Sequence, residues 1–331
     1  MDYAYDLQHE AAQNLADYKQ VEPQSIWVPS ANGKDQLHVM VWRPLDQPRA
    51  VVQLVHGMAE HIARYADFAS CLACNGYAVV GHDQLGHGRS CAEGQQKGHL
   101  TLANGVNLLL EDVKRVGDFA QREFNHAPLV LLGHSMGSFT ARCYAAEHGD
   151  DLAAVILSGT GNPPLAASKG GNLLCKLLGA LRGETHRSKL VDSLATGGYN
   201  KSIATPRTPF DWLSYYAANV DAYVEDPDCG FMFSVGGYAA LTELTARAAQ
   251  PATARRYPTD LPMLLISGED DPVGGTKADQ VKAAHKLISG AKQGRCDLRI
   301  FPYMRHEILN ERENRAVYAF VLEWLNDVLA D

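Results

Sequence analysis

One segment of the chain, residues 129–138, constrains the fold more than any other. It reads Leu-Val-Leu-Leu-Gly-His-Ser-Met-Gly-Ser, which is an apolar run, then Gly-x-Ser-x-Gly, then residues that favour a helix. A serine held between a strand and a helix needs a tight, strained turn, and Gly133 and Gly137 remove side chains that would clash there. The pattern therefore predicts a strand, a sharp turn that presents Ser135 as a nucleophile, and a helix.

Strands and helices alternate along most of the chain. Short apolar runs predict strands at residues 37–43, 50–56, 77–82, 129–134, 153–158, 262–267 and 297–301. Helical patterns occupy residues 62–75, 104–124, 136–148, 276–289 and 313–329. This alternation is typical of crossover connections on a parallel sheet. We therefore expect an α/β fold with a mostly parallel central sheet flanked by helices.

The alternation fails between residues 161 and 248, where no short apolar strand is bounded by turns. We expect this cap segment (residues 161–248) to be an inserted, mainly helical domain, with a core formed by residues 1–160 and 249–331. Aromatic residues are dense between residues 199 and 238 of this segment and suit either the cap's own core or the apolar roof of a pocket. They are Tyr199, Phe210, Trp212, Tyr215, Tyr216, Tyr223, Phe231, Phe233 and Tyr238.

Charge and composition exclude several classes of protein. A formal charge of -8 argues against nucleic-acid binding, which needs a basic surface. The chain has no run of about 18 apolar residues and no secretory leader, so we expect a cytoplasmic protein, either free or peripheral at a membrane. Its seven cysteines are scattered, which favours reduced thiols over disulfides. Cys71 and Cys74 have metal-site spacing, but no second cysteine pair follows, so we expect no metal.

A serine hydroxyl attacks well only when a base takes its proton, so a histidine and a carboxylate should lie further along the chain. In this type of sheet the expected order is Ser, Asp, His. Asp271 follows the strand at 262–267 and precedes Pro272, whose ring favours a turn that aims the carboxylate inward. Asp270 is the alternative acid. His306 follows the last predicted strand and is the expected base.

Catalysis also needs N–H donors at the point where the oxyanion forms. One is the backbone N–H of Met136, directly after the nucleophile. The other is expected from the loop after the strand at 50–56, which we call the oxyanion loop (residues 57–61). Gly57 lets the backbone approach a substrate there, and the N–H of Met58 is the candidate donor.

Three motifs share a resemblance. They are residues 56–65 (His-Gly-Met-Ala-Glu-His-Ile-Ala-Arg-Tyr), residues 83–90 (Asp-Gln-Leu-Gly-His-Gly-Arg-Ser) and residues 133–137 (Gly-His-Ser-Met-Gly). From about residue 35 onward the chain resembles the monoglyceride lipase and lysophospholipase branch of the α/β-hydrolases. The resemblance implies the α/β-hydrolase fold, and Asp271 and His306 match the acid and base of that family.

Within that family, the residues that match Glu60 and Arg64 are associated with the polar end of the acylglycerol site. An internal ion pair that braces the oxyanion loop is the alternative interpretation. Leu309 stands where some monoglyceride lipases have a second histidine, so recognition of glycerol as in the mammalian enzymes is not expected. Asp83 is expected to accept backbone N–H groups at a strand end.

The expected reaction is a two-step acyl transfer that needs no metal or organic cofactor. The expected substrate is a small lipid-like ester, either a monoacylglycerol or a lysophospholipid. An aryl or short-chain ester, or a peptide with an N-terminal proline, is the alternative on the same fold, and a ligand-binding relative without turnover is the alternative from another class. The acyl chain and the oligomeric state do not follow from the sequence.

The first half of the cap segment is basic. Residues 161–210 hold seven basic side chains against two acidic ones, Glu184 and Asp192; the basic ones are Lys169, Lys176, Arg182, Arg187, Lys189, Lys201 and Arg207. Leucines at helical spacing between residues 173 and 181 predict an amphipathic helix. It either rests on an anionic membrane or packs on its own domain with a solvated basic face.

Overall fold

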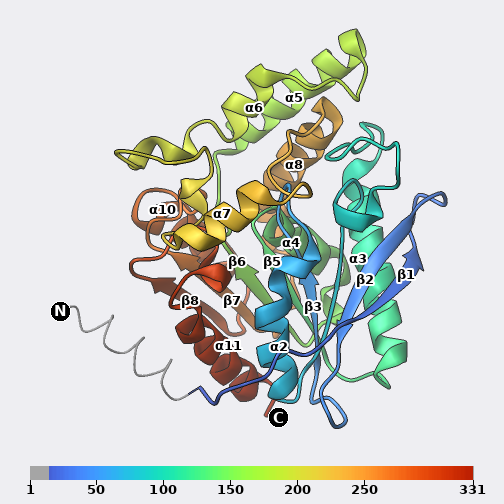
Figure 1. Ribbon diagram of the computed structural model, residues 1–331, viewed down its shortest axis with the longest axis vertical. Coiled ribbons are helices and arrows are strands. Elements are labelled where there is room, and N and C mark those ends of the chain that lie inside the picture. Colours follow the sequence, from blue (N-terminus) through green and yellow to red (C-terminus); the bar gives the residue numbers. More distant parts are fainter. Residues whose placement is uncertain (1–14, 331) are drawn as a thin grey trace.

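The computed structural model describes residues 15–330 and is built on one eight-stranded sheet (Figure 1). The strands are β1 (Gln24–Pro29), β2 (Gln36–Trp42), β3 (Val51–Val55), β4 (Ala78–His82), β5 (Leu129–His134), β6 (Ala154–Ser158), β7 (Met263–Gly268) and β8 (Cys296–Phe301). Their order in the sheet is β1-β2-β4-β3-β5-β6-β7-β8. The pairs β1–β2 and β2–β4 are antiparallel and the remaining pairs are parallel, which confirms the expected α/β class.

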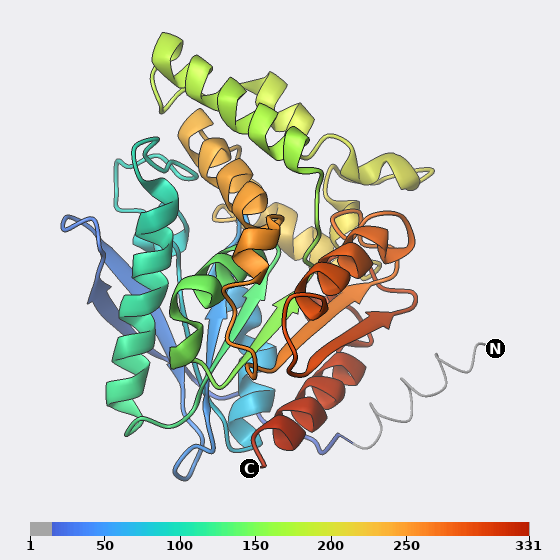
Figure 2. The same ribbon diagram turned by 180° about the vertical axis from the view of Figure 1, so that it is seen from behind.

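Helices cover both faces of the sheet. They are α2 (Ala66–Cys74), α3 (Gly105–Glu123), α4 (Met136–His148), α5 (Leu165–Arg182), α6 (Lys189–Ala195), α7 (Ala217–Glu225), α8 (Val235–Ala248), α9 (Pro251–Ala254), α10 (Asp279–Ser289) and α11 (Asn314–Val328). The apolar faces of α2 and α11 pack on one side of the sheet. Those of α3, α4 and α10 pack on the other, seen in Figure 2.

The central strands β5, β6 and β7 are buried along their whole length. Strands covered by helices on both faces read as continuous apolar runs, and this is why the sequence pattern located them. All three run parallel, so their carboxyl ends open at the same edge of the sheet. Open α/β sheets place their ligands at that edge.

The structure corrects the sequence prediction in two places. β1 was not expected, because its residues alternate between exposed and half-buried and include polar side chains such as Gln24 and Ser25. The helix expected at 276–289 begins only at Asp279, after a 3-10 turn in which Lys277 and Ala278 have positive φ angles of 50° and 59°. Two successive left-handed residues interrupt a helix, and a hydrophobic period does not reveal them.

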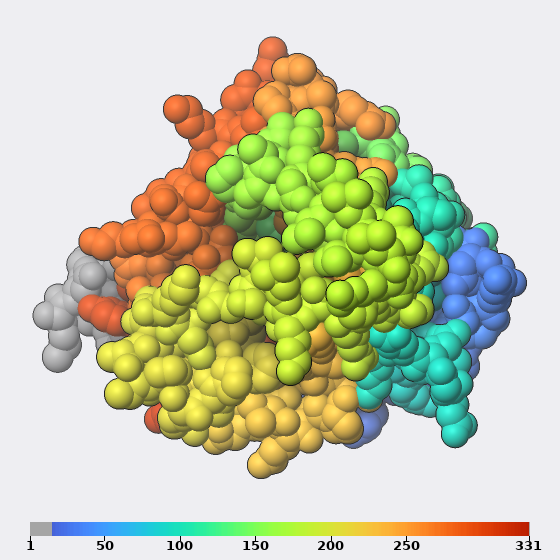
Figure 3. All heavy atoms as spheres, turned by 90° about the horizontal axis from the view of Figure 1, so that it is seen from above, coloured from blue at the N-terminus to red at the C-terminus, as the bar shows by residue number. Residues whose placement is uncertain are grey.

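Between β6 and β7, which are neighbours in the sheet, the chain forms helices and no strand. Helix α5 packs along α8, and α8 packs on α4 of the core. The cap segment therefore lies over the carboxyl ends of the strands, at the top of Figure 1 and spread across the view from above in Figure 3.

One buried side chain joins the two ends of the cap segment. Arg142 on α4 is fully buried, and its guanidinium donates to the carbonyl of Gly161 at 2.7 Å and to that of Ala248 at 2.6 Å. These two residues are the limits that the sequence pattern predicts for the insertion. The contacts support the proposed division into a core and a cap. In the described residues no helix is long and apolar enough to span a membrane.

Candidate active site

Ser135 lies at the sharp turn between β5 and α4 with φ 53° and ψ -119°, a strained conformation for a residue with a side chain. The flanking glycines make the turn possible. A Cβ on Gly133 would lie 2.1 Å from the carbonyl oxygen of Gly137, and a Cβ on Gly137 would lie 2.0 Å from that of Val55. The strained strand-turn-helix geometry predicted from the sequence is therefore present.

The candidate acid and base meet from the ends of β7 and β8. Nδ1 of His306 lies 2.9 Å from Oδ1 of Asp271, and both side chains are buried. The same carboxylate accepts the backbone N–H of Val273 at 2.8 Å. Asp270, the alternative acid, instead accepts the hydroxyl of Tyr215 at 2.9 Å. The geometry thus brings Asp271 to the histidine, and Asp270 points elsewhere.

Burial and charge set the protonation states of this pair. Burial alone lowers the pKa of His306, but the charge and hydrogen bond of Asp271 outweigh it and raise the pKa above its usual value. Burial alone raises the pKa of Asp271, but His306 and the amide of Val273 lower it. An ionised carboxylate accepts but cannot donate, so the proton of neutral His306 stays on Nδ1. Nε2 of that imidazole is then free to act as a base.

Two further residues pack around the base and were missed in the sequence. Gly159, directly after β6, has a φ of 59°, and a Cβ there would lie 2.9 Å from Cε1 of His306. His134 lies beside His306 with ring centroids 4.6 Å apart. Burial and the neighbouring His306 lower the pKa of His134 to about 4, so its imidazole is neutral at pH 7. In the sequence, the only sign that residue 159 lies close to the base is that it is a glycine directly after the predicted strand at 153–158.

The oxyanion loop lies against the nucleophile. A Cβ on Gly57 would lie 3.0 Å from the Cβ of Ser135, so only glycine allows this approach. Met58 and Met136 both line the same cavity as Ser135. Within residues 15–330, neither of their backbone N–H groups donates to a protein acceptor. Both amides are therefore available to a substrate oxygen.

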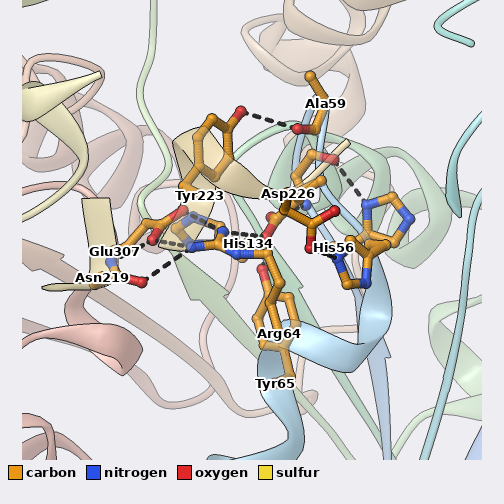
Figure 4. Close-up of polar contacts among 12 residues, drawn as sticks. His56, Ala59, Arg64, Tyr65, His134, Asn219, Tyr223, Asp226 and Glu307 are labelled. Atoms are coloured by element: carbon orange, nitrogen blue, oxygen red, sulfur yellow. Dashed lines mark hydrogen bonds and ion pairs between the residues drawn. The ribbon is translucent and has the colours of Figure 1, made fainter. Parts of the chain in front are cut away.

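A buried ion-pair network supports that loop (Figure 4). Oε1 of Glu60 accepts the N–H of Gly57 at 2.5 Å, and its Oε2 accepts from Arg64 at 2.9 Å. Arg64 also binds both carboxylate oxygens of Glu307, at 2.5 and 2.7 Å, and donates to Asn219 of α7 at 3.1 Å. Glu60 lies in the cavity wall and Arg64 lies behind it. This arrangement matches the internal ion pair that was the alternative interpretation; Glu307 and Asn219 were not predicted.

The cap segment also holds the oxyanion loop directly. The carbonyl of Ala59 accepts the hydroxyl of Tyr223 and the N–H of Gly230, each at 2.9 Å. Nε2 of His61 lies 2.9 Å from the carboxylate of Asp226. Figure 4 shows Tyr223, Ala59 and Asp226 in this contact region. The position of the Met58 amide therefore depends on α7 and on the turn that follows it.

A cavity of about 720 Å³ opens beside Ser135 and His306. Five of the nine cap aromatics line it, namely Tyr199, Phe210, Trp212, Tyr223 and Phe231. Phe233 and Tyr238 are buried in the hydrophobic core instead. The dense aromatic segment therefore forms both part of a core and the roof of a pocket.

Acidic side chains line the cavity wall. Its carboxylates belong to Glu60, Asp192 and Glu307, and no lysine or arginine lines it within the described part of the chain. The seven basic side chains of residues 161–210 are all exposed and lie outside the lining. The local excess of basic residues is thus a property of the outer surface.

One group of possible metal ligands occurs in residues 15–330. His61, Asp226 and Cys229 have ligand atoms within 4.8 Å of one another. The pair Cys71 and Cys74 does not take part in such a group, and all seven cysteines are free thiols. Asp83 accepts the backbone N–H groups of Ile62 and Arg89, each at 2.9 Å, as expected for a structural aspartate.

Comparison with known proteins agrees with this geometry. The family model for serine aminopeptidase S33 matches residues 46–313. The chain is 30% identical over 289 residues to a monoacylglycerol lipase of Mycolicibacterium smegmatis, covering 86% of this chain and 91% of that protein. It is 26% identical to the monoglyceride lipase of Homo sapiens, covering 82% and 79% of the two chains.

Solved structures show the same architecture. A thermostable carboxyl esterase from Bacillus coagulans in complex with glycerol superposes with a TM-score of 0.87 at 27% identity, covering 93% of this chain and 99% of the esterase. A soluble variant of monoglyceride lipase from Saccharomyces cerevisiae has a TM-score of 0.73 at 19% identity, covering 95% and 98%. The second likeness concerns the fold alone.

Proposed function

Because this chain belongs to the serine aminopeptidase S33 family of α/β-hydrolases, we propose that it hydrolyses neutral lipid esters of the monoacylglycerol class. Its general activity is that of a carboxylic-ester hydrolase. We propose, in addition, the substrate class, the catalytic residues and the contacts of the cap segment. The substrate class is inferred from the carboxylates that line the cavity.

A neutral head group fits that wall better than a phosphate. A lysophospholipid would bring its anionic phosphate near Glu60, Asp192 and Glu307, and like charges in a cavity of low dielectric repel strongly. Arg64 neutralises part of this charge, but it already binds both Glu60 and Glu307. The hydroxyls of a glyceride carry no charge and can donate to these carboxylates. The similarity to the monoacylglycerol lipase of Mycolicibacterium smegmatis and to the human monoglyceride lipase supports the same class.

The proposed reaction runs through an acyl-enzyme. Oγ of Ser135 attacks the ester carbonyl and gives its proton to Nε2 of His306, which Asp271 orients and stabilises as the imidazolium. The backbone N–H groups of Met58 and Met136 bind the oxyanion. The alcohol leaves with the proton from His306. Water, activated by the same histidine, then releases the fatty acid.

Glu60 and Arg64 are proposed to position the oxyanion loop. The short hydrogen bond from the Gly57 amide to Glu60 fixes the turn just before Met58. Arg64 holds Glu60 in place and links it to Glu307, the neighbour of the catalytic histidine. Of Glu60 and Arg64, Glu60 reaches the cavity wall and Arg64 does not, so a direct substrate contact is open to Glu60 and not to Arg64.

Release of fatty acid from a matched set of oleoyl lipids tests the substrate class. We expect kcat/KM for monooleoylglycerol to exceed that for the anionic lysophosphatidic acid by about a hundredfold, the effect of about 3 kcal/mol of repulsion. Asp192→Asn removes a negative charge that is not paired with Arg64, so the ratio of the two kcat/KM values should decrease. Ser202→Ala, at an exposed position of the cap segment, is the control. Equal or higher activity on the phosphate lipid would exclude the proposal.

Cleavage of peptides with an N-terminal proline is the second candidate. Glu60 and Glu307 are the groups that would bind a substrate ammonium, as the aminopeptidase name of the family suggests. Their existing pairing with Arg64 disfavours it. Hydrolysis of proline p-nitroanilide at a rate comparable to that of monooleoylglycerol would favour this candidate over the lipase.

The cap segment is further proposed to contact lipid surfaces. Leucines 173, 177 and 181 on α5 and 190 and 194 on α6 are between 55% and 80% exposed, and the basic side chains around them are exposed as well. Apolar side chains beside positive charges bind anionic membranes. Sedimentation with vesicles of phosphatidylglycerol and phosphatidylcholine should recover the protein, and Leu177→Glu with Leu181→Glu should abolish it. Failure of the native protein to sediment would refute this contact.

A further inference from the structure

A second chain of Ser, His and Asp hydrogen bonds lies at the β1–β2 edge of the sheet. Oγ of Ser25 lies 3.1 Å from Nε2 of His38, and Nδ1 of His38 lies 3.0 Å from Oδ2 of Asp83. We call these residues the edge triad, and Ser135, His306 and Asp271 the central triad. No member of the edge triad lines the cavity of Ser135. Ser25 and His38 also precede the residues that the family model matches.

Strand pairing produces the edge triad. In the antiparallel pair of β1 and β2, Ser25 is opposite Met40, so His38 is its diagonal neighbour on the same face. β2 also pairs with β4, and the backbone N–H of Asp83, just after β4, donates to the carbonyl of His38 at 2.9 Å. Three strands therefore bring the three side chains into line.

The contacts of Asp83 determine which nitrogen of the His38 imidazole carries the proton. Burial by itself raises the pKa of Asp83, but the hydrogen bond from His38, the charge of His56 and two backbone amides lower it to about 2. The carboxylate is thus ionised and accepts the Nδ1 proton of His38. Nε2 of His38 is left as the acceptor for the hydroxyl of Ser25, which is the order of a catalytic triad.

The surroundings of Ser25 favour a particular kind of reagent. Ser25 is exposed, and Trp27, which pairs with His38 across the strands, is 48% exposed. The guanidinium of Arg89 lies 5.5 Å from the ring centroid of Trp27, and its Nη1 lies 3.1 Å from Nε2 of His38. An aromatic face and a cation beside the hydroxyl suit a small aryl ester. Arg89 and the Ser25 hydroxyl both donate toward the lone pair of Nε2, so this hydroxyl is activated less than that of Ser135 in the central triad.

We propose that Ser25 is a second activated serine, which small aryl esters acylate once. Oγ of Ser25 forms a bond to the acyl carbon while its proton passes to Nε2 of His38. The bond between the acyl carbon and the aryl oxygen breaks, and the aryl oxide leaves and takes up that proton. The products are an O-acyl serine and a phenol. Ser25 lies outside the cavity that the residues Met58 and Met136 line, so it lacks their oxyanion donors and the acyl group accumulates rather than turning over.

The test uses p-nitrophenyl acetate on the full chain carrying Ser135→Ala, with acetylated peptides quantified by mass spectrometry. Acetylation of Ser25 should be about a hundredfold faster than that of Ser202, the lower range of general-base catalysis. Ser202 is also exposed but has no histidine contact in residues 15–330. His38→Gln should reduce labelling of Ser25 to the rate of Ser202. Equal labelling of the two serines, or unchanged labelling in His38→Gln, would overturn the proposal.

A second variant, Ser25→Cys, tests activation by His38 independently of whether His38→Gln folds. Ser25→Cys keeps a nucleophile at an exposed position, and a thiol beside an imidazole ionises at lower pH than an isolated one. The pH profile of its alkylation by iodoacetamide should therefore lie below that of Ser202→Cys, with Cys74 as an internal exposed reference. Superimposable profiles would contradict activation by His38. Because Ser135 is absent or unreactive in both tests, neither outcome depends on the proposed lipase activity.

Discussion

The histidine–aspartate hydrogen bonds of the central and edge triads have nearly the same length in very different settings. The distance from the histidine Nδ1 to the aspartate is 2.9 Å for His306 and 3.0 Å for His38. Ser135 occupies a left-handed turn at the head of α4, inside a cavity and beside two free amides. Ser25 occupies an ordinary strand at an exposed edge. What separates the two sites is the environment of the serine, since the relay behind it is shared.

This difference indicates where the catalytic power resides. A relay supplies a base, which contributes about a hundredfold to ten-thousandfold. Preorganised donors at the oxyanion add about a hundredfold to a thousandfold per N–H, and a cavity that excludes water strengthens them. The central triad has all of these, and the edge triad has only the relay and a competing cation, Arg89. We therefore expect turnover at the first and slow modification at the second.

The largest effect that tests this comparison is Ser135→Ala. Loss of the nucleophile should lower kcat for monooleoylglycerol about 10⁶-fold, because the base and the oxyanion donors then have no hydroxyl to act on. Fatty-acid release and labelling by a fluorophosphonate measure it, with Ser202→Ala as the control. Residual turnover within a hundredfold of the native rate would mean that the edge triad is itself a working catalyst.

Asp271→Asn should have the next largest effect. The amide preserves the shape of the site but no longer fixes the proton on Nδ1 of His306, so kcat should fall about 10⁴-fold. Asp270→Asn is a matched control one residue away, since Asp270 contacts Tyr215 and not the histidine. Steady-state kinetics on both variants decide between the two carboxylates. A greater loss in the Asp270 variant would reverse the assignment.

Gly57→Ala tests the oxyanion loop that the edge triad lacks. The added Cβ would lie 2.7 Å from Oε1 of Glu60 and 3.0 Å from the Cβ of Ser135, so the loop must shift. We expect kcat to fall about a hundredfold with little change in KM, because one oxyanion donor is displaced. Gly170→Ala, at an exposed glycine of α5 where an added Cβ would meet nothing within 4 Å, is the control. A change confined to KM would argue that this loop binds substrate only.

Asp83→Ala tests the structural role of the edge triad's acid. It removes a buried carboxylate that accepts the Ile62 and Arg89 amides as well as His38. The free energy of unfolding should fall by about 2 kcal/mol, typical for hydrogen bonds to a charged group. Asp46→Ala, on the exposed turn before β3, provides the comparison. Equal denaturation midpoints for the two variants would show that Asp83 is not an anchor.

The pH profile is the smallest and most diagnostic effect. Neutral His306 is the base, so activity is lost as the pH falls through the pKa of its imidazole in the free enzyme. Because Asp271 raises this pKa above its usual value, the acid limb of kcat/KM should lie above about pH 6.5. In Asp271→Asn the limb should move to lower pH, since the raising charge is gone. Identical limbs in both proteins would indicate that another group controls the profile.

Much of the fold was predictable because its signals are local. The runs that form β3 to β7 are buried on both faces and read as apolar segments within a residue or two of their limits. The Gly-x-Ser-x-Gly turn was predictable because the motif is a local sequence pattern. The clash that requires Gly133 lies within it, at Gly137, whereas the clash that requires Gly137 is with Val55 of β3. The half-exposed strand β1 gave no such signal and was missed.

The details of the site were less predictable, because they join residues far apart in the chain. The pairing of Arg64 with Glu307 spans 243 residues and depends on where β8 ends. Asn219 enters the same network from α7 of the cap segment. The basic residues of the cap segment face outward, whereas carboxylates line the cavity. Sequence composition reports how many charges a segment has and says nothing about the side on which they lie.

The sequence alone determined the α/β class, the strained turn at Ser135 and the strand-end positions of Asp271 and His306, and it predicts an insertion at residues 161–248. Periodicity, glycine sterics and chain order are sufficient for these, because each acts over a few neighbouring residues. Only the tertiary structure decided that Asp271 rather than Asp270 meets His306, that Glu60 braces a loop, and that Ser25 aligns with His38. Those contacts depend on strand register and on side chains from separate elements, so they exist only once the sheet has assembled.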